Sequence, residues 1–439
     1  MRELRFDAVV IGAGAAGMAS SLSLTQRGYR CALVDREDSM GGILLQCIHN
    51  GFGLQHFGEE LTGPEFAGRQ ERDVRAASVP FFADTTVLSI ERAAPEAGTG
   101  FVLLLSSASG GIVSVECRAV ILAMGSRERN RGNIRIAGDR PSGVFTAGLA
   151  QRLINIDGYL PGKKAVIIGS GDIGLIMARR LTLSGAKVEA VVEIQSFPSG
   201  LTRNVVQCLN DYSIPLYLSH ATLRVIGKDR VTGVEIAPLE NGAARSDKAF
   251  AIDCDTVLLS VGLVPENELS SKAGVALNPA TGGPVVDSRL MTSVSGIFAA
   301  GNVLHIHDLV DRVAEEAARA GLCCADYLDA LGKAPSRRSG DPVNGIAGVQ
   351  RALKTGVNIR YTVPSSLDPA SGGRIYLRSM VMMDRGTVRI THDGREVFAK
   401  RLSWIRPGEM ISVDYKAGQL PPTGGSFEIS LTADEEAMS

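Results

Sequence analysis

Two short apolar runs in the first half of the chain are each followed at once by a glycine-rich turn and then by a helical pattern. The runs cover residues 6–11 (FDAVVI) and residues 164–168 (KAVII). Continuous apolar runs of this length are typical of strands buried on both faces, as in a parallel sheet covered by helices. The pattern therefore predicts two α/β units, each opening on a buried parallel strand.

Three later apolar runs also lead into a glycine. The runs and their glycines are residues 119–123 with Gly125, residues 255–260 with Gly262, and residues 296–300 with Gly301. A glycine at a strand end lets the backbone come close to a ligand. After the last of these, residues 308–331 carry apolar side chains at helical spacing, with Asp308 in the position of an N-cap. We expect this helix to return to the first unit.

The pattern changes after residue 333. Residues 333–348 are polar and rich in turn formers, which is typical of a linker. Six strand-like runs follow at residues 359–363, 374–381, 386–392, 396–402, 410–415 and 426–431. They predict a small all-β domain, with Trp404, the only tryptophan, in its core.

Both glycine-rich turns have the spacing G-x-G-x-x-G. They are Gly12-Ala13-Gly14-Ala15-Ala16-Gly17 and Gly169-Ser170-Gly171-Asp172-Ile173-Gly174. The first glycine permits the tight turn, the second lets backbone N–H groups approach a pyrophosphate, and the third lets helix and strand pack closely. The helix that follows points its positive end at the phosphates. The turns therefore predict two bound dinucleotides.

The residues around the turns strengthen this prediction. With 50 glycines in 439 residues, one such spacing is weak evidence by itself. Here each turn follows a strand, and an acid, Asp35 or Glu193, lies 18 or 19 residues beyond the third glycine. A carboxylate at that strand end accepts hydrogen bonds from the adenosine ribose. We therefore predict an α/β protein with two Rossmann-like dinucleotide-binding domains and a small C-terminal all-β domain.

Composition and charge exclude several other classes of protein. A formal net charge of -1 gives no basic excess for binding nucleic acid or an acidic membrane surface. The seven cysteines are scattered and show no CxxC spacing, which indicates neither a disulfide framework nor a zinc or iron–sulfur site. The N-terminus runs directly into the first strand, and no apolar run is long enough to span a membrane. We expect a protein of the reducing cytoplasm.

One segment has residues of the types that bind metals: His305, His307, Asp308 and Asp311. They lie at a strand-to-helix turn, and no cysteine or second cluster completes a coordination sphere. The sequence therefore predicts no metal site.

The order of these motifs resembles the flavoproteins with two dinucleotide-binding domains, the pyridine nucleotide-disulfide oxidoreductase-like family, which bind FAD first and a nicotinamide nucleotide second. Residues 41–53 (GGILLQCIHNGFG) and 301–311 (GNVLHIHDLVD) are similar to a bacterial subgroup associated with glycerol-3-phosphate dehydrogenase. The resemblance extends to the FAD/NAD subunits of opine oxidases, dye-linked proline dehydrogenases and hydrogen cyanide synthase. It implies an FAD domain of residues 1–155 and 283–332, an inserted NAD domain of residues 156–282, a linker of residues 333–358 and the all-β domain of residues 359–439.

The resemblance also implies which residues bind each cofactor. Those for FAD are Gly12, Gly14, Ala15, Ala16, Gly17, Asp35, Arg36, Gly42, Val87, Ala123, Gly125, Gly301, Asn302 and Val310. Those for NAD are Gly169, Gly171, Asp172, Ile173, Gly174, Glu193 and Gly262. The wider family has an aspartate in place of Asn302, so a charge-assisted bond to the ribityl chain becomes a neutral and weaker one. Glu193 would repel a 2′-phosphate and so favour NADH over NADPH.

The chain departs from the disulfide reductases of this fold, which carry two cysteines at the positions of Leu44 and His49. Without this pair no dithiol relays electrons from the flavin to a disulfide substrate. Cys47 and His49 are the candidate catalytic residues. Cys47 is either a thiolate whose pKa is lowered beside a flavin and a helix N-terminus, or a small buried side chain. His49 either moves a proton at the flavin or is structural.

The expected activity is hydride transfer between NADH and FAD. Three functions remain open. The chain is the nicotinamide-side subunit of a dehydrogenase complex acting on glycerol 3-phosphate, an opine or an amino acid, with a second flavoprotein as its partner. Alternatively, it is an NADH oxidase or peroxidase that uses Cys47, or a non-catalytic nucleotide sensor or scaffold. The sequence indicates neither the final electron acceptor nor the oligomeric state.

Overall fold

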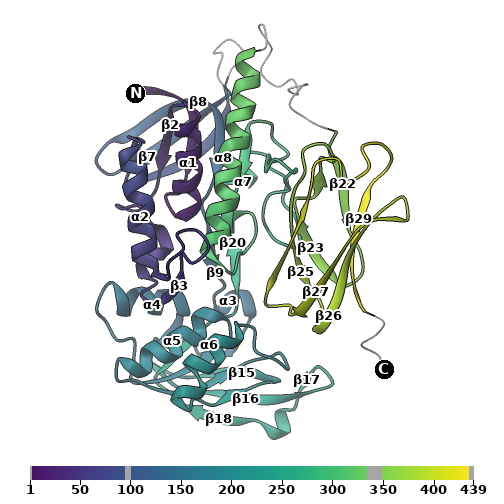
Figure 1. The fold of residues 1–439 in the computed structure, drawn as a ribbon. Helices are drawn as coiled ribbons and strands as arrows, with labels where there is room; N and C mark the ends of the chain where they lie inside the picture. Colours follow the sequence, from purple (N-terminus) through teal and green to yellow (C-terminus); the bar gives the residue numbers. More distant parts are fainter. Residues whose placement is uncertain (1, 94–99, 334–348, 435–439) are drawn as a thin grey trace. The chain divides into compact units, whose positions relative to one another are not determined.

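A computed structural model of the chain describes residues 2–93, 100–333 and 349–434 (Figure 1). It contains two compact units. One consists of Met1–Ser126 together with Pro265–Ser439, and the other of Arg127–Val264. The chain thus leaves the first unit, builds the second, and returns.

The first unit contains a seven-stranded sheet. Its strand order is β5 (Phe81–Phe82), β2 (Cys31–Val34), β1 (Arg2–Ile11), β8 (Gly111–Leu122), β7 (Phe101–Ser107) and β6 (Thr85–Arg92), and β21 (Ile297–Ala299) also pairs with β8. The pairs β5–β2, β2–β1, β1–β8 and β8–β21 are parallel, whereas β8, β7 and β6 form an antiparallel meander. Val9, Val10 and Val120 are fully buried, as expected for strands covered on both faces.

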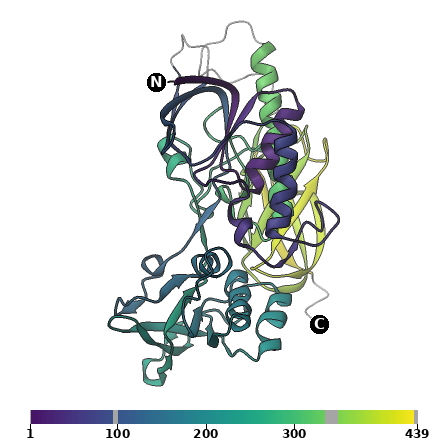
Figure 2. The ribbon, with the colours of Figure 1, turned by 90° about the vertical axis from the view of Figure 1, so that its left-hand side faces the viewer.

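Three helices of the first unit pack together: α1 (Ala15–Gln26), α2 (Gly63–Ala76) and α8 (Val310–Lys333). Figure 1 shows α1 between α2 and α8, and Figure 2 shows the same helices after a 90° turn. The contact between α1 and α8 is close because a Cβ on Gly321 would lie 2.5 Å from the carbonyl oxygen of Ser20. The predicted return of the last helix to the first unit is therefore what the structure shows. The short elements of this unit are η1 (Gly42–Gln46), β3 (Asn50–Phe52), β4 (Leu61–Thr62), α7 (Glu268–Lys272) and η5 (Gly301–Val303).

The second unit contains a five-stranded parallel sheet. Its order is β11 (Val144–Thr146), β19 (Thr256–Leu259), β12 (Lys164–Ile168), β13 (Lys187–Val192) and β14 (Leu216–Tyr217). Its helices are α3 (Arg131–Ile134), α4 (Ala147–Asn155), α5 (Asp172–Leu183) and α6 (Thr202–Cys208). A second sheet contains β10 (Ala137–Gly138), β15 (His220–Gly227), β16 (Val231–Glu240), β17 (Ala243–Ala244) and β18 (Phe250–Asp253).

The C-terminal part of the first unit consists of two packed β-sheets. One has the order β24 (Ser366–Leu367), β22 (Arg351–Thr355), β29 (Phe427–Ala433), β26 (Met383–His392) and β27 (Arg395–Ile405). The other has the order β23 (Ile359–Val363), β25 (Gly373–Ser379) and β28 (Met410–Tyr415). Phe427 and Val388 from one sheet and Ile375 from the other share one buried core.

The sheet of β23, β25 and β28 also packs on the α/β part of the first unit. Tyr361, Val363 and Tyr376 belong to the same hydrophobic core as β1 and β8. Ser365 adds a backbone hydrogen bond of 3.0 Å from its N–H to the carbonyl oxygen of Val286. The all-β domain is therefore part of the first unit's core.

The predicted fold class, two Rossmann-like domains and a C-terminal all-β domain, is confirmed. The sequence placed the second domain at residues 156–282, whereas the compact unit is Arg127–Val264. Of the range assigned to a linker, residues 334–348 lie outside the described residues and β22 is a strand. Within the described residues, no helix is long and apolar enough to cross a membrane.

Two local predictions were wrong. Trp404 is not a core residue: 54% of it is exposed, and the guanidinium of Arg406 lies 3.7 Å from the centre of its ring. Asp308 is not in the N-cap position of α8, because the helix begins at Val310; the Asp308 carboxylate instead accepts a hydrogen bond of 2.6 Å from the N–H of Met410 and pairs with Arg378. In both cases the side chain takes its place from tertiary contacts that the local pattern does not contain.

Candidate functional site

The first glycine turn joins β1 to α1, and close backbone contacts explain two of its glycines. Gly12 has a φ of +103°, and a Cβ there would lie 2.3 Å from the carbonyl oxygen of Ala123. A Cβ on Gly17 would lie 1.7 Å from the carbonyl oxygen of Gly12. Side chains at these positions would force β1, α1 and the end of β8 apart.

Gly14 is different because the space in front of it is open. It is the N-cap of α1, has no side-chain cap, and has no heavy atom within 4 Å of the position that a Cβ would take. The first N–H groups of a helix have no partner inside the helix, and they attract an anion through the helix dipole. The residues Ala15 and Ala16 form the first turn of α1. This open cradle fits a dinucleotide pyrophosphate.

Asp35 directly follows β2 and holds the turn in place. Its Oδ2 accepts a hydrogen bond of 2.5 Å from the N–H of Ala13, and its Oδ1 accepts one of 3.0 Å from the N–H of Glu37. A carboxylate has about four lone-pair positions, so acceptor capacity remains for ribose hydroxyls. The exposed Arg36 lies next to it in the chain. Binding of the adenosine ribose by Asp35 stays a prediction.

Other residues expected at the FAD site lie around this turn. A Cβ on Gly42 would lie 3.2 Å from the Cα of Gly14, and one on Gly301 would lie 2.9 Å from the Cβ of Ala16. The N–H of Thr85 donates a 2.8 Å hydrogen bond to the carbonyl oxygen of Asp35. The remaining expected residues are Val87 on β6, Ala123 and Gly125 after β8, and Val310 at the start of α8. Gly125 also faces open space.

Asn302 lies in η5 and uses its amide oxygen within its own loop. That oxygen accepts a hydrogen bond of 3.1 Å from the N–H of His307. The side-chain NH2 group is then the part that is left to donate to a ligand.

In the second unit the glycine turn joins β12 to α5 and packs against Ser260. A Cβ on Gly169, whose φ is +91°, would lie 2.1 Å from the carbonyl oxygen of Ser260. The N–H of Gly174 donates a 3.0 Å hydrogen bond to the Ser260 hydroxyl. Gly171 is the N-cap of α5, which begins at Asp172. This turn has the same strand–turn–helix geometry as the first.

Glu193 directly follows β13 and, unlike Asp35, is almost completely buried. Its Oε2 accepts hydrogen bonds from the N–H of Ser170 (2.9 Å), the hydroxyl of Ser170 (2.6 Å) and the hydroxyl of Ser199 (2.9 Å). Its Oε1 accepts one of 2.9 Å from the N–H of Gln195. A carboxylate has about four lone-pair positions that accept hydrogen bonds, and Glu193 already has four donors. Of the residues that donate to it, Ser170 is fully buried, whereas Gln195 and Ser199 are exposed, and of these two only Ser199 donates from its side chain.

Residues 199–204 are folded onto the second glycine turn. The N–H of Gly200 donates to the carbonyl oxygen of Ser170 at 2.9 Å. The Oδ1 of Asp172 accepts from the N–H of Leu201 at 2.8 Å and from the amide of Asn204 at 2.7 Å. Ser199 and Asn204 were not predicted from the sequence, because short polar residues in a loop carry no spacing signal of their own.

Cys47 follows η1 and therefore lies at the C-terminal end of that helix, not at a helix N-terminus. Its thiol donates to the carbonyl oxygen of Ile43 at 3.3 Å. Burial raises the pKa of the Cys47 thiol to about 12, although part of the residue reaches the surface. Of the two interpretations of Cys47, this environment favours the small buried side chain, because the loss of water around the thiol raises its pKa.

His49 lies close to the surface of the first unit. Its Nδ1 lies 3.0 Å from the carbonyl oxygen of Asn50, and its ring packs at 5.0 Å from that of Phe52. A role in proton transfer stays a hypothesis for this residue.

The four residues with metal-binding side chains do not stay together. Asp311 is buried, and its carboxylate accepts from the N–H groups of Gly53, Gln55 and His56 at 3.1, 3.0 and 2.8 Å. Asp308 binds the all-β domain, as described above. Asp311 therefore holds the loop of residues 53–56, and Asp308 holds the start of β28.

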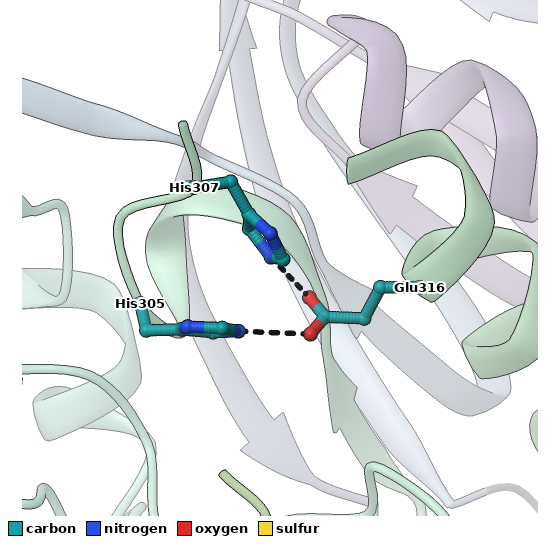
Figure 3. Close-up of side chains that lie close together, drawn as sticks. All are labelled: His305, His307 and Glu316. Atoms are coloured by element: carbon teal, nitrogen blue, oxygen red, sulfur yellow. Dashed lines mark hydrogen bonds and ion pairs between the residues drawn. The ribbon is translucent and has the colours of Figure 1, made fainter. Parts of the chain in front are cut away.

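His305 and His307 instead point at Glu316 on α8 (Figure 3). The Nε2 of His305 lies 2.9 Å from Oε2 of Glu316, and the Nε2 of His307 lies 3.2 Å from its Oε1. The same Oε1 accepts a 2.7 Å hydrogen bond from the N–H of Gly301. Burial lowers the pKa of His305 to about 4, while the two histidines hold the pKa of Glu316 well below its usual range. Glu316 was not predicted from the sequence, since its partners precede it on a different element.

Comparison with known proteins agrees with this geometry. Residues 6–321 match the family model "Pyridine nucleotide-disulphide oxidoreductase". An alkyl hydroperoxide reductase subunit of Pseudomonas aeruginosa is 28% identical over 74% of this chain and 58% of its own length. An opine oxidase subunit of Agrobacterium tumefaciens is 28% identical over 68% of this chain and 61% of its own length. The chain thus spans about three fifths of the length of these relatives.

Among solved structures, the thioredoxin reductase of T. acidophilum superposes with a TM-score of 0.59 at 23% identity, covering 73% of this chain and 98% of that one. At this identity the likeness shows the fold. The matched region includes both glycine turns and both acids that follow them. The chain therefore belongs to the pyridine nucleotide-disulphide oxidoreductase family, with FAD and a nicotinamide nucleotide as its cofactors.

Proposed function

We propose that this chain is an oxidoreductase that transfers hydride between NADH and its own FAD and exchanges the electrons of that FAD with a redox partner outside the chain. The observation that carries the proposal is that each of the two compact units has a G-x-G-x-x-G turn at the N-terminus of a helix, at residues 12–17 and 169–174. The bound flavin supplies the hydride acceptor. Gly14 and the first turn of α1 bind its pyrophosphate, and Asp35 binds its adenosine ribose. Gly301 and Asn302 orient the ribityl chain.

The second unit holds the nicotinamide nucleotide by the same means. Gly171 and the N-terminus of α5 bind the pyrophosphate, and Glu193 accepts from the ribose after Ser199 has moved aside. A 2′-phosphate would meet the buried negative charge of Glu193, and no arginine occurs between residues 194 and 202. A penalty of about 1.4 kcal/mol already means a tenfold preference for NADH.

Anaerobic stopped-flow reduction tests this proposal. We expect the flavin absorbance of the purified holoprotein to bleach with one equivalent of NADH, and at least tenfold more slowly with NADPH at equal, subsaturating concentration. Equal rates would contradict the nucleotide preference. A flavin spectrum that neither nucleotide changes would contradict the activity itself and would favour the sensor or scaffold alternative.

Thiol chemistry does not support an NADH peroxidase. All seven cysteines are free, and burial raises the pKa of every one of them. A peroxidatic cysteine needs a thiolate at neutral pH. Electrons that leave the flavin without a thiol relay need an acceptor or a second redox protein.

A second flavoprotein is the partner that we propose. It oxidises glycerol 3-phosphate, an opine or an amino acid, and the two electrons pass through the FAD of this chain to NAD⁺, which becomes NADH. One relative is by its name part of an opine oxidase. The all-β domain has exposed apolar side chains, Met380, Met382 and Trp404, that are available for contact with a partner.

Isolation from the native source under gentle conditions tests the partner. We expect a second flavoprotein at fixed stoichiometry, and anaerobic reduction of the flavin in that complex by one of the three substrates. A chain that is isolated alone yet bleaches fully with NADH would contradict the complex and leave the NADH activity standing.

A further inference from the structure

His305, His307 and Glu316 form a buried cluster that neither cofactor site uses directly. Their side chains are 0%, 1% and 1% exposed. Their potential ligand atoms, one from each side chain, all lie within 4.8 Å of one another. Figure 3 shows that both imidazoles turn the same nitrogen, Nε2, toward the carboxylate.

The spacing of these atoms fits one metal ion. Zinc lies about 2.0–2.2 Å from histidine nitrogen and carboxylate oxygen, so two ligands of a tetrahedral site are roughly 3.3 Å apart. The two distances from Nε2 to the carboxylate are 2.9 and 3.2 Å. All three ligand atoms lie within 4.8 Å of one another, so the side chains would have to draw together by at most about 1.5 Å to hold one ion.

The charge of the cluster also favours a cation. Among the described residues, neither arginine nor lysine forms an ion pair with Glu316, whose contacts are the two imidazoles and the N–H of Gly301. A carboxylate removed from water is costly unless it is paired or binds a metal. A divalent ion held by Oε2 would pair the charge and take over the Nε2 of His307 from Oε1, and Oε1 would keep its bond to Gly301.

The surroundings close the site. The ring of Tyr376 on β25 lies 5.3 Å from both imidazole rings, and that of Tyr361 on β23 lies 6.2 Å from the ring of His305. His305 and His307 come from the loop after η5, and Glu316 from α8. An ion here would tie this loop to the helix where the all-β domain packs.

We propose that His305, His307 and Glu316 bind one divalent transition-metal ion, most suitably Zn²⁺. Two imidazoles and a carboxylate are ligands that zinc accepts, and a fourth position remains for water. By fixing Glu316, the ion holds Gly301, which is expected at the FAD site, in its place. The proposal does not depend on the NADH activity, since the ion is neither substrate nor electron carrier.

Metal analysis of the full-length holoprotein tests the site. The chain is produced without a polyhistidine tag, incubated with Zn²⁺, desalted, and measured by plasma mass spectrometry. We expect about one equivalent of zinc per chain, and a zinc absorption-edge spectrum with two imidazoles among the zinc ligands. A wild-type chain with less than about 0.1 equivalent after this loading would overturn the proposal, and the cluster would then be a metal-free hydrogen-bond network.

Two substitutions test whether the zinc is bound at this cluster. Glu316→Gln keeps the size and the acceptor for Gly301 but removes the charge, so we expect its zinc content to fall at least tenfold. His220→Gln is the matched control, because His220 lies in the second unit and its Nδ1 contacts the carbonyl oxygen of Leu218. Zinc retained in Glu316→Gln and lost in His220→Gln would contradict the assignment. If Glu316→Gln does not fold, the wild-type zinc content and absorption-edge spectrum still decide.

Discussion

At the scale of single residues, the glycines of the first turn have two separate roles. Gly12 and Gly17 are needed for folding, since backbone atoms lie within 2.3 Å of any added Cβ. Gly14 has no such neighbour, and its φ of -73° suits any residue. We infer that its side chain is absent because a ligand needs the space. The same motif thus contains positions that act on stability and one that acts on binding.

Substitutions by alanine should separate these two roles. We expect Gly14→Ala to fold with a melting temperature of the FAD-free protein within about 2 °C of wild type, and to lose at least tenfold in FAD affinity. Gly12→Ala should lose several kcal/mol of stability because the backbone clash adds to the strained φ. Calorimetry and flavin fluorescence measure both effects. Full FAD affinity in Gly14→Ala would show that the cradle is not where the pyrophosphate binds.

Cys47 leads to a prediction about pH. With a pKa of about 12 in the folded chain, its thiol is ionised in roughly one molecule in 10⁴ at pH 8, against about a quarter of molecules for an unperturbed thiol. We expect alkylation by iodoacetamide to be about 10³-fold slower than for a free thiol, and to rise only above about pH 10, because raising the pH toward the raised pKa forms the thiolate. Peptide mass spectrometry follows Cys47, with urea-unfolded protein as the reference. Rapid labelling at neutral pH would favour the peroxidase alternative.

At the scale of elements, the loop between η5 and α8 is held from both sides. On one side α8 provides Glu316, and on the other β25 provides Arg378. The guanidinium of Arg378 donates to the carbonyl oxygen of Ile306 at 3.2 Å and pairs with Asp308. Arg374 on the same strand pairs with Glu315 at 2.5 Å. The all-β domain therefore stabilises the loop that leads from Gly301 into the last helix.

Arg378→Ala should weaken this contact strongly. The side chains of Arg378 and Asp308 are only 13% and 18% exposed, so removing the cation leaves a mostly buried carboxylate without its charged partner. We expect the free energy of unfolding, measured from the first transition in urea, to fall by about 2–4 kcal/mol. Arg389→Ala, whose partner Glu396 is 47% exposed, is the control and should cost less than about 1 kcal/mol. Equal losses of stability in the two variants would show that the ion pair of Arg378 stabilises the chain no more than an exposed ion pair does.

At the scale of the whole molecule, the same strand–turn–helix arrangement occurs once in each unit, but the acid that follows it has different contacts. Both units place a glycine turn between a buried parallel strand and a helix, and both follow it with an acid at the end of the next strand. The acids differ: Asp35 binds two backbone N–H groups, whereas Glu193 already binds four donors. We infer that the first site is built for a cofactor that stays and the second for one that exchanges, since ribose binding there competes with Ser199.

The sequence by itself determined the α/β class, the two glycine turns, their acids and most strands of the all-β domain. These follow from local rules: strand and helix periodicity, and backbone positions at which only glycine fits. It did not determine the environments of Cys47, Asp308 or Trp404, nor the meeting of Glu316 with the two histidines. Burial, ion pairing and ligand geometry depend on which distant segments pack together, and only the tertiary structure decides that.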